Sequence, residues 1–412
     1  MPRGFQMVQE NSKRLIPALL LLACSGVASA SGFQSFEQNA SGIGNAYSGS
    51  AAVADNASTI FFNPAGMTQL QAHEISGGLT AVDSSVRFND KGSSVGALAG
   101  TGDGGDAGNW LLVPNGYLSW ALNKDWYVGI GIGRPFGVKN EYNDPWLGAA
   151  QATLFEIKTV NINPSVAYRV NDKVSLGFGL NWQRAELDYR HHQSTASTAP
   201  WKLTLDDDSW GWNAGALFTI SPSTKVGVSY RSAIKYDLTG KIASTTPGNA
   251  KASLKLPGTF ILSVSQKLSD KWEMLGDASW TGWNSISNVN ILRSSGALEQ
   301  SLDTDFRNTW RVALGANYKF NDAWKLKYGV AYDQTPVQRA ANRQAFLPDN
   351  DRFWLSIGAQ WAPSKTSALD LGLSYIIVKD SRINNSQATF GRVTGDYEAN
   401  NWLLGAQYSL SF

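Results

Sequence analysis

The sequence predicts an all-β fold, a fourteen-stranded antiparallel transmembrane β-barrel with an N-terminal hatch, or plug, in its lumen. Three observations indicate this fold: apolar residues alternate with polar or small ones, short polar turns alternate with long loops, and one strand face is rich in aromatic residues. The last segment shows the alternation best, because one of its faces carries Trp402, Leu404, Ala406, Tyr408, Leu410 and Phe412. Side chains of a strand point alternately to opposite sides, and in a barrel lipid would cover this aromatic face.

Residues 1–30 have the pattern of a secretory signal peptide. Lys13 and Arg14 precede an apolar run over 15–23, and small residues continue to Ala30, after which cleavage is expected. The run is too short for a membrane helix, which needs about 20 apolar residues. An alternative is a lipoprotein site at 21–24, which would place a lipid on Cys24.

The chain without this leader has no net charge. Of 35 basic and 33 acidic residues, 32 of each sign remain. This balance argues against a nucleic-acid partner, which requires a basic surface. Removal of the leader also takes away the only cysteine, so we expect neither disulfides nor thiol chemistry. The 16 tryptophans and 14 tyrosines suit aromatic belts at the two membrane surfaces.

Residues 31–72 and 73–412 differ in pattern. The first region is rich in Ala, Gly, Ser and Asn without regular alternation, so we expect compact, partly helical material packed in the lumen. The second region is predicted to form the barrel. Its short polar turns lie at 123–125, 171–173, 221–223, 269–271, 321–322 and 363–365. Six turns and seven longer loops give fourteen strands, with both ends of the barrel on the periplasmic side.

Tryptophans accompany the short turns. Trp126, Trp272, Trp324 and Trp361 lie at or next to a turn. An indole at such a position buries its ring in lipid and keeps its N–H in contact with water. We therefore expect these side chains to form the inner aromatic belt.

The chemistry of the two strand faces reverses toward the loop side. In the segment 174–190, apolar residues occupy the even positions up to Trp182, but Arg184, Glu186, Asp188 and Arg190 follow on that face. A β-bulge could flip one strand, whereas strands that continue beyond the membrane would flip together. Several flips on one side favour the second explanation and predict an apolar chamber for a hydrophobic cargo. Its predicted lining is Phe155, Leu187, Tyr189, Ile291 and Trp354.

Two prolines fall inside predicted strands. Pro135 lies in the segment 126–142 near Gly137, and Pro164 lies in the neighbouring strand. Proline cannot donate to the strand ladder, and a closed barrel has no free edge. Either the two prolines mark bulges, or the strand is kinked and leaves a lateral opening toward lipid.

Several motifs resemble the FadL family of outer-membrane transporters for long-chain fatty acids, whose relatives carry aromatic hydrocarbons such as toluene. The matching segments are 31–34, 44–47, 62–67, 135–137, 161–164, 333–336 and 347–356. The resemblance covers essentially all of 31–412. It implies a bacterial outer-membrane location and a fourteen-stranded barrel whose hatch has its turn at Asn63, Pro64 and Ala65.

The resemblance also implies a transport route. Ligand would enter from the outer loops, bind in an apolar pocket near Phe33, and leave through a kinked third strand at Pro135 and Gly137. The implied function is passive transport of hydrophobic molecules, with long-chain fatty acids first. The alternatives are a toluene-type uptake channel and a general porin.

The carboxylate anchors of the family match this chain only in part. Fatty-acid transporters of the family use one basic residue on the fifth strand and a lysine before the tenth. The first matches Arg190 or His191 here, whereas Leu302 and Asp303 stand near the second. Arg307 and Arg311 are predicted to point inward nearby and could substitute. Alternatively, such an arginine only pairs with an acidic residue of the lumen.

Other chemistries find little support in the sequence. His73, His191 and His192 are the only histidines, and neighbours on a strand point to opposite faces, so no metal site is expected. No nucleophile and base share a strand face, so we expect no enzyme and no cofactor. The expected partners are hydrophobic small molecules, outer-membrane lipid and lipopolysaccharide, with the protein acting as a monomer.

Overall fold

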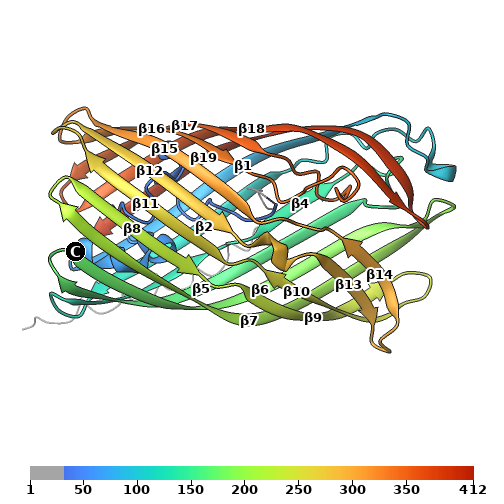
Figure 1. Cartoon of the computed structure of the whole chain (residues 1–412), viewed down its shortest axis with the longest axis horizontal. Coiled ribbons are helices and arrows are strands. Elements are labelled where there is room, and N and C mark those ends of the chain that lie inside the picture. The colour runs from blue at the N-terminus through green and yellow to red at the C-terminus, as the bar shows by residue number, and fades with distance from the viewer. Residues whose placement is uncertain (1–31) are drawn as a thin grey trace, which may run out of the picture.

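The strands close into one antiparallel barrel. The structure is a computed structural model that describes residues 32–412, so the predicted signal peptide and the alternative at Cys24 lie outside the described residues. Strand β1 (His73–Asp90) pairs with β2 (Trp110–Ala121) on one side and with β19 (Gly391–Ser411) on the other. This last pairing closes the sheet, whose strands are strongly tilted (Figure 1).

The described residues form fourteen strands, which confirms the predicted number. Nine are continuous: β1, β2, β5 (Leu154–Asn171), β6 (Val174–Ser194), β7 (Ser197–Ser221), β16 (Trp324–Asp333), β17 (Arg352–Ser364), β18 (Ser367–Gln387) and β19. Five are interrupted: β3 and β4 (Trp126–Gly133, Gly137–Glu141), β8 and β9 (Thr224–Arg231, Ile234–Ala243), β10 and β11 (Gly248–Leu256, Thr259–Lys267), β12 and β13 (Trp272–Thr281, Asn288–Arg293), and β14 and β15 (Leu298–Asp303, Thr309–Lys319).

The six predicted turns join strands at one end of the barrel. In three of them an asparagine side chain forms the turn: Asn123 Oδ1 accepts from Trp126 N at 3.0 Å, Asn171 Oδ1 from Val174 N at 3.0 Å, and Asn321 Oδ1 from Trp324 N at 2.9 Å. Asparagine favours such turns because its side chain replaces a backbone acceptor. Phe412 N donates to His73 O at 3.0 Å, so both ends of the barrel lie on this turn side, as predicted.

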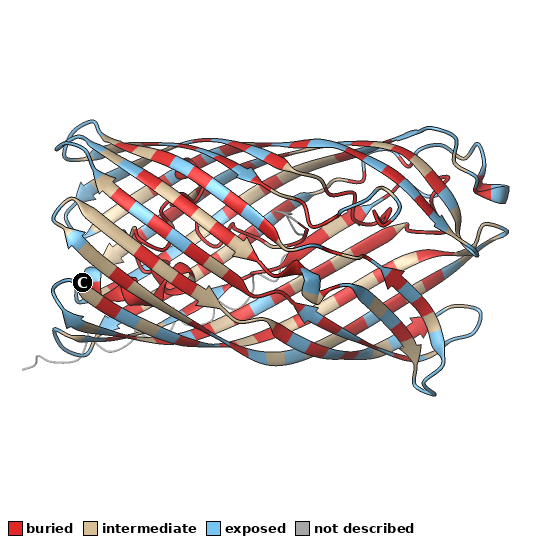
Figure 2. Ribbon diagram, viewed as in Figure 1, coloured by how far each residue is buried: buried red, intermediate tan, exposed pale blue. Residues whose placement is uncertain are grey.

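The strands are longer than a membrane requires. β6 has 21 residues and β7 has 25, whereas about 9–11 residues span the hydrocarbon core. Their register is constant from Val174↔Phe218 to His192↔Pro200, so no bulge accounts for the reversal in β6. One face of β6 is at least partly exposed from Val174 to Arg190 and changes from apolar to charged residues beyond Trp182, while the opposite face is mostly buried. Figure 2 shows this alternation of buried and exposed positions along the strands. A bulge does occur in β18, between Val378 and Ser381.

Residues 32–72 lie inside the barrel and are almost entirely buried (Figures 1 and 2). They contain η2 (Ile43–Asn45), α1 (Thr59–Phe62) and η3 (Pro64–Gln69). We call residues 32–72 the N-terminal segment. Whether it works as a hatch stays a prediction.

Glycines of the wall make room for this segment. A Cβ added to Gly177 would lie 2.2 Å from the backbone N of Ala65, and one added to Gly227 would lie 1.9 Å from the O of Ala51. Only a residue without a side chain allows such an approach. Two further short helices, η4 (Gly96–Leu98) and η5 (Trp283–Ser285), lie outside this segment. Among residues 32–412, no helix is both long and apolar enough to cross a membrane.

Candidate functional site

A large apolar cluster fills the loop side of the lumen. Strands β4, β5, β6, β7, β9, β10 and β13 contribute to it together with several loops. We call it the loop-side cluster, and it brings together Phe33, Phe155, Leu187, Tyr189 and Ile291 with Trp201, Trp283 and Phe346. Five of the predicted ligand-binding residues therefore meet in one place.

Aromatic rings dominate the contacts of this cluster. The Phe155 ring stacks on Phe346 with 4.4 Å between centroids, and Tyr189 lies 5.3 Å from the same ring. Phe346 belongs to the connection 334–351 between β16 and β17, which folds into the lumen. Phe346 therefore occupies part of the predicted chamber.

Phe33 connects the loop-side cluster to the wall. Its ring meets Trp283 edge-on at 4.9 Å and Phe136 at 6.2 Å. Its carbonyl O accepts from Gly137 N at 2.7 Å, and Ser35 N donates to Pro135 O at 2.8 Å. The start of the N-terminal segment thus bonds to the interruption between β3 and β4.

The wall is irregular at this interruption. Residues 134–136 face only 159 and 160 on β5, so the register shifts by one residue there. Within the described pairings, β2 bonds to β3 from Gly116 onward and never to β4. Across Pro164 the register of β5 with β6 is unchanged, so the bulge interpretation is wrong for that proline.

A second cluster is built around the N-terminal segment and includes Phe36, Tyr47, Phe62 and Trp354. We call it the segment cluster. Trp354 was predicted to line the apolar chamber, but its ring lies 6.4 Å from Tyr47 in this cluster. The predicted location of Trp354 is therefore wrong: its side chain is buried, but in the segment cluster and not in the loop-side cluster. The strand parity gave the direction of the side chain but not its height in the lumen.

Arg311 points inward as predicted and borders the segment cluster. Its Nη2 donates to Ala46 O at 2.6 Å, and its guanidinium carbon lies 4.5 Å from the Phe36 ring centre and 5.1 Å from that of Trp354. Its Nε and Nη1 have no hydrogen-bond partner among the described residues. Two donors of this buried cation therefore make no hydrogen bond, although the acidic residue Asp333 stands directly opposite Arg311 on β16.

Glu37 is the carboxylate of the N-terminal segment in this region. It is fully buried, and neither of its side-chain oxygens has a hydrogen-bond partner within residues 32–412. Burial raises the pKa of the Glu37 carboxyl to about 7, against the opposing charges of Arg352 and Arg311. Its charge therefore changes near neutral pH.

Two predicted anchors do not face the lumen. Arg190 lies on the outer face of β6, where its Nη2 is 2.7 Å from Asp188 Oδ2. The inward position belongs to His191, which is buried and stacks on Trp201 at 4.3 Å. Arg307 is exposed and donates to Thr335 O. Parity failed for it because 304–308 interrupts the strand between β14 and β15.

Arg231, at the end of β8, is a lumen residue that was not among those predicted from the sequence. Its guanidinium lies 4.1 Å above the Phe61 ring, and Nη2 donates to Phe61 O at 3.0 Å. It borders a cavity of about 30 Å³ next to Pro135 and Phe136. Alternation along 224–231 places it on the inward face, so parity could have identified it.

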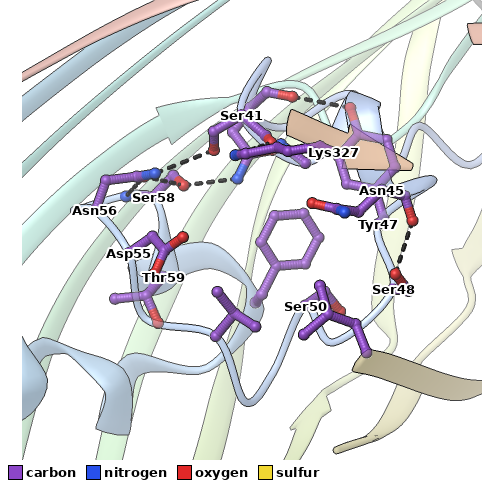
Figure 3. A pocket seen from close by; sticks show the side chains of 15 residues that line it. Ser41, Asn45, Tyr47, Ser48, Ser50, Asp55, Asn56, Ser58, Thr59 and Lys327 are labelled. Carbon is purple, nitrogen blue, oxygen red and sulfur yellow. Dashed lines mark hydrogen bonds between the residues drawn. The ribbon is translucent and has the colours of Figure 1, made fainter. Parts of the chain in front are cut away.

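The N-terminal segment is held by polar contacts. Lys327 of β16 pairs with Asp370 at 2.7 Å, with side chains only 3% and 1% exposed, and donates to Ser41 O at 2.9 Å. Both Lys327 and Ser41 line a cavity of about 50 Å³ (Figure 3). Nearby, the ammonium of Lys325 lowers the pKa of the Asp55 carboxyl to about 2.

The predicted turn at Asn63, Pro64 and Ala65 is fixed through its asparagine. Asn63 Oδ1 accepts from Ala65 N at 3.1 Å, while Nδ2 donates to Ala51 O at 2.7 Å and to Ala216 O at 3.0 Å. Pro64 starts η3, where its missing N–H is not needed. One side chain therefore joins the turn, the segment and β7.

A wider cavity of about 480 Å³ opens among the loops. His191, Trp201, Gln300 and Phe390 are among its lining residues, so it adjoins the loop-side cluster. Within residues 32–412, no three His, Cys, Asp or Glu side chains gather as a metal ion would require.

Comparison with known proteins gives one consistent family. Residues 21–412 match the outer membrane protein transport protein family (OMPP1/FadL/TodX). The long-chain fatty acid transport proteins of Salmonella typhi and Escherichia coli K12 are each 29% identical, with 96% of this chain and 97% of the relative covered. Outer membrane protein P1 of Haemophilus influenzae is 31% identical over 90% of both chains.

Solved structures agree in fold. A Pseudomonas aeruginosa FadL homologue has a TM-score of 0.86 at 24% identity, covering 92% of this chain and 100% of its own. The P. putida toluene transporter TodX has a TM-score of 0.70 at 16% identity, with 91% and 98% covered. At such identities the likeness concerns the barrel itself.

Proposed function

This chain belongs to the outer membrane protein transport family of OMPP1, FadL and TodX, and on that premise we propose that it carries long-chain fatty acids inward by passive transport. It is a bacterial outer-membrane protein. The proposal depends mainly on one observation: buried Arg311, with two unused donors, lies among aromatic rings at the N-terminal segment. A carboxylate with an alkyl chain fits a cation beside apolar rings.

The proposed route begins at the cavity among the loops. The alkyl chain then replaces Phe346 in the loop-side cluster and contacts Phe155, Leu187, Tyr189 and Ile291. The N-terminal segment acts as a hatch, and its shift breaks the hydrogen bonds of Phe33 and Ser35 to the wall. Release follows between β2 and β4, beside Pro135 and Gly137.

A second candidate cargo is an aromatic hydrocarbon of the toluene type. The stacked rings of Phe155, Tyr189 and Phe346 favour it, as does the absence of a lysine near Leu302 and Asp303. In either case we propose a monomeric transporter, not an enzyme, without a nucleic-acid partner.

Uptake measurements distinguish the two cargoes. Labelled oleate and labelled toluene would be offered to a Gram-negative host that lacks its own transporter, with and without this protein. We expect oleate uptake to fall roughly tenfold in Arg311→Met, which corresponds to a lost charge-assisted hydrogen bond. Arg311→Lys should retain most uptake, and the exposed Arg307→Met is the matched control. Toluene uptake alone would contradict the fatty-acid proposal.

The lateral exit has its own test. Gly137→Val adds a β-branched side chain where Gly137 N bonds to Phe33 O. We expect a folded barrel with reduced uptake of either cargo. Gly116→Val is the control, because nothing lies within 4 Å of a Cβ at Gly116. Unchanged uptake in Gly137→Val would refute release at this place.

A liposome leak assay tests the hatch and the porin alternative together. Wild-type protein should pass no small ions, because the N-terminal segment fills the lumen. Gly177→Val should leak, since its side chain would collide with the backbone of Ala65. Free passage through the wild type would instead support a general porin.

A further inference from the structure

The outward face of β9 and β10 carries four lysines but only one acidic residue, Asp237. They are Lys235 and Lys241 on β9, and Lys251 and Lys255 on β10, and we call them the lysine patch. The register places Lys235 directly opposite Lys255, and Lys251 opposite Thr239, one step from Lys241 on the same face. Like charges directly opposite each other destabilise a sheet.

Few acidic groups are available to this patch. Among the described residues, Lys241, Lys251 and Lys255 form no ion pair, and Lys235 meets only Asp237, at 3.2 Å in an exposed contact. None of the three acidic side chains of neighbouring β7 pairs with these lysines. Asp206 binds Arg184 at 2.8 Å, Asp207 accepts from the backbone N of Asp237 at 2.9 Å, and Asp208 accepts from Trp182 Nε1 at 3.0 Å.

The adjacent part of the wall behaves differently. Across β5, β6 and β7, outward charges alternate in sign and pair between strands. Lys158 meets Glu186 at 2.8 Å, and Lys202 meets Asp188 at 3.3 Å. The excess of positive charge therefore belongs to β9 and β10 and is not a general property of the projecting strands.

The patch begins where the lipid-facing surface ends. Tyr230 lies opposite Phe260 on the outward face of β8 and β11. Directly beyond the interruptions at 232–233 and 257–258, the next outward pair is Lys235 and Lys255. Aromatic residues mark the membrane–water boundary, so the lysines lie at the level of lipid head groups.

We propose that the lysine patch binds the phosphate groups of the lipopolysaccharide in the outer leaflet. Opposite residues on a strand pair stand about 5 Å apart, so Lys235 and Lys255 can share one phosphate. Lys241 and Lys251, on the diagonal at about 7–8 Å, can hold a second one. Lysine binds phosphate as a point charge, and the bound phosphates remove the repulsion between the lysines.

Lipid A binding tests the proposal. Purified protein would be incubated with bisphosphorylated lipid A, or with lipid A from which both phosphates have been removed, and the bound lipid would be counted by native mass spectrometry. In the variant Lys235→Gln, Lys241→Gln, Lys251→Gln, Lys255→Gln, we expect bound bisphosphorylated lipid A to fall at least fivefold. The dephosphorylated lipid should bind equally to both proteins.

A matched control carries the same change of charge at the other end of the barrel. It replaces the exposed turn lysines, namely Lys124, Lys173, Lys271 and Lys365, by glutamine. This variant should bind lipid A as the wild type does. The proposal would be overturned if both variants lost lipid A binding equally, or if the variant of the lysine patch lost none. Competition by inorganic phosphate alone would show that a free anion, not the lipid, is recognised.

Thermal unfolding gives an independent readout. Without lipid A, removal of the opposed lysines should leave the unfolding temperature unchanged or raise it. With bisphosphorylated lipid A, the same variant should unfold at a lower temperature than the wild type. A shift of the same sign in both conditions would mean a purely structural effect and would overturn the proposal. Oleate uptake is a separate measurement, so its outcome does not decide this one.

Discussion

The loop-side cluster and the N-terminal segment fill the same lumen by different means. The loop-side cluster is filled by the packing of aromatic rings and aliphatic side chains, as at Phe155 and Phe346. Directed contacts hold the second, as at Lys327 and Asn63. Apolar contacts are non-directional, so an alkyl chain can replace a side chain at little cost. A hydrogen-bonded segment can move only if the buried donors and acceptors that it leaves form new hydrogen bonds. The first region suits changing cargo, and the second suits a defined closed state.

The largest effect on the free energy of unfolding is expected at the buried ion pair between Lys327 and Asp370, next to the N-terminal segment. Lys327→Met leaves the Asp370 carboxylate buried without its cation, which should lower the free energy of unfolding by about 3–5 kcal/mol. Denaturant unfolding of the reconstituted barrel measures it. The double variant Lys327→Met, Asp370→Leu should recover much of the loss. If the single variant is as stable as the wild type, polar contacts do not hold this region.

Glu37 should make the stability of the same region depend on pH. Burial raises the pKa of its carboxyl to about 7. A carboxyl with a raised pKa in the folded state favours folding less as pH increases from its unfolded value toward 7. Glu37→Gln should therefore stabilise the protein by up to about 3 kcal/mol at pH 8 and hardly at pH 4. Unfolding curves at the two pH values check this, and equal effects would contradict it.

Asn63 tests whether shape alone is enough in the N-terminal segment. Asn63→Leu roughly keeps the volume but removes the amide that serves Ala51, Ala65 and Ala216. Unsatisfied buried backbone groups should cost about 1–3 kcal/mol. Denaturant unfolding gives the value. A neutral result would mean that water replaces the amide.

The matched substitution in the loop-side cluster should have the smallest effect. Leu187→Met conserves volume in an apolar environment, so we expect a loss below about 1.5 kcal/mol. The comparison with Asn63→Leu uses the same unfolding assay. If Leu187→Met cost more than Asn63→Leu, the proposed difference between the two regions would be refuted.

Alternation and turn chemistry were enough to predict the barrel. Fourteen strands, six short turns and the outward charges beyond Trp182 follow from side-chain parity, because each strand has one lipid face or water face. Parity also placed Phe155, Tyr189 and Arg311 toward the lumen. It failed at Arg307, where the strand is interrupted, and Arg190 was matched to an anchor that its own parity directs outward.

Other features depend on contacts between distant parts of the chain. The height of Trp354 in the lumen depends on the tilt of β17 and on where Tyr47 packs. The entry of Phe346 into the predicted chamber depends on a loop that shows no alternation. The bond between Phe33 and Gly137 joins residues more than a hundred positions apart. A local pattern carries no information about such pairs.

The pairing of β1 with β19 has a consequence for biogenesis. These strands join residues more than 300 positions apart, as in Glu74↔Ser411. Contacts between such distant residues form slowly, because the intervening chain must first be ordered. Until β19 arrives, β1 exposes an unpaired edge, which is a template for wrong association. We therefore expect that another molecule must cover the unpaired edge of β1 from export of the chain until β19 pairs with it.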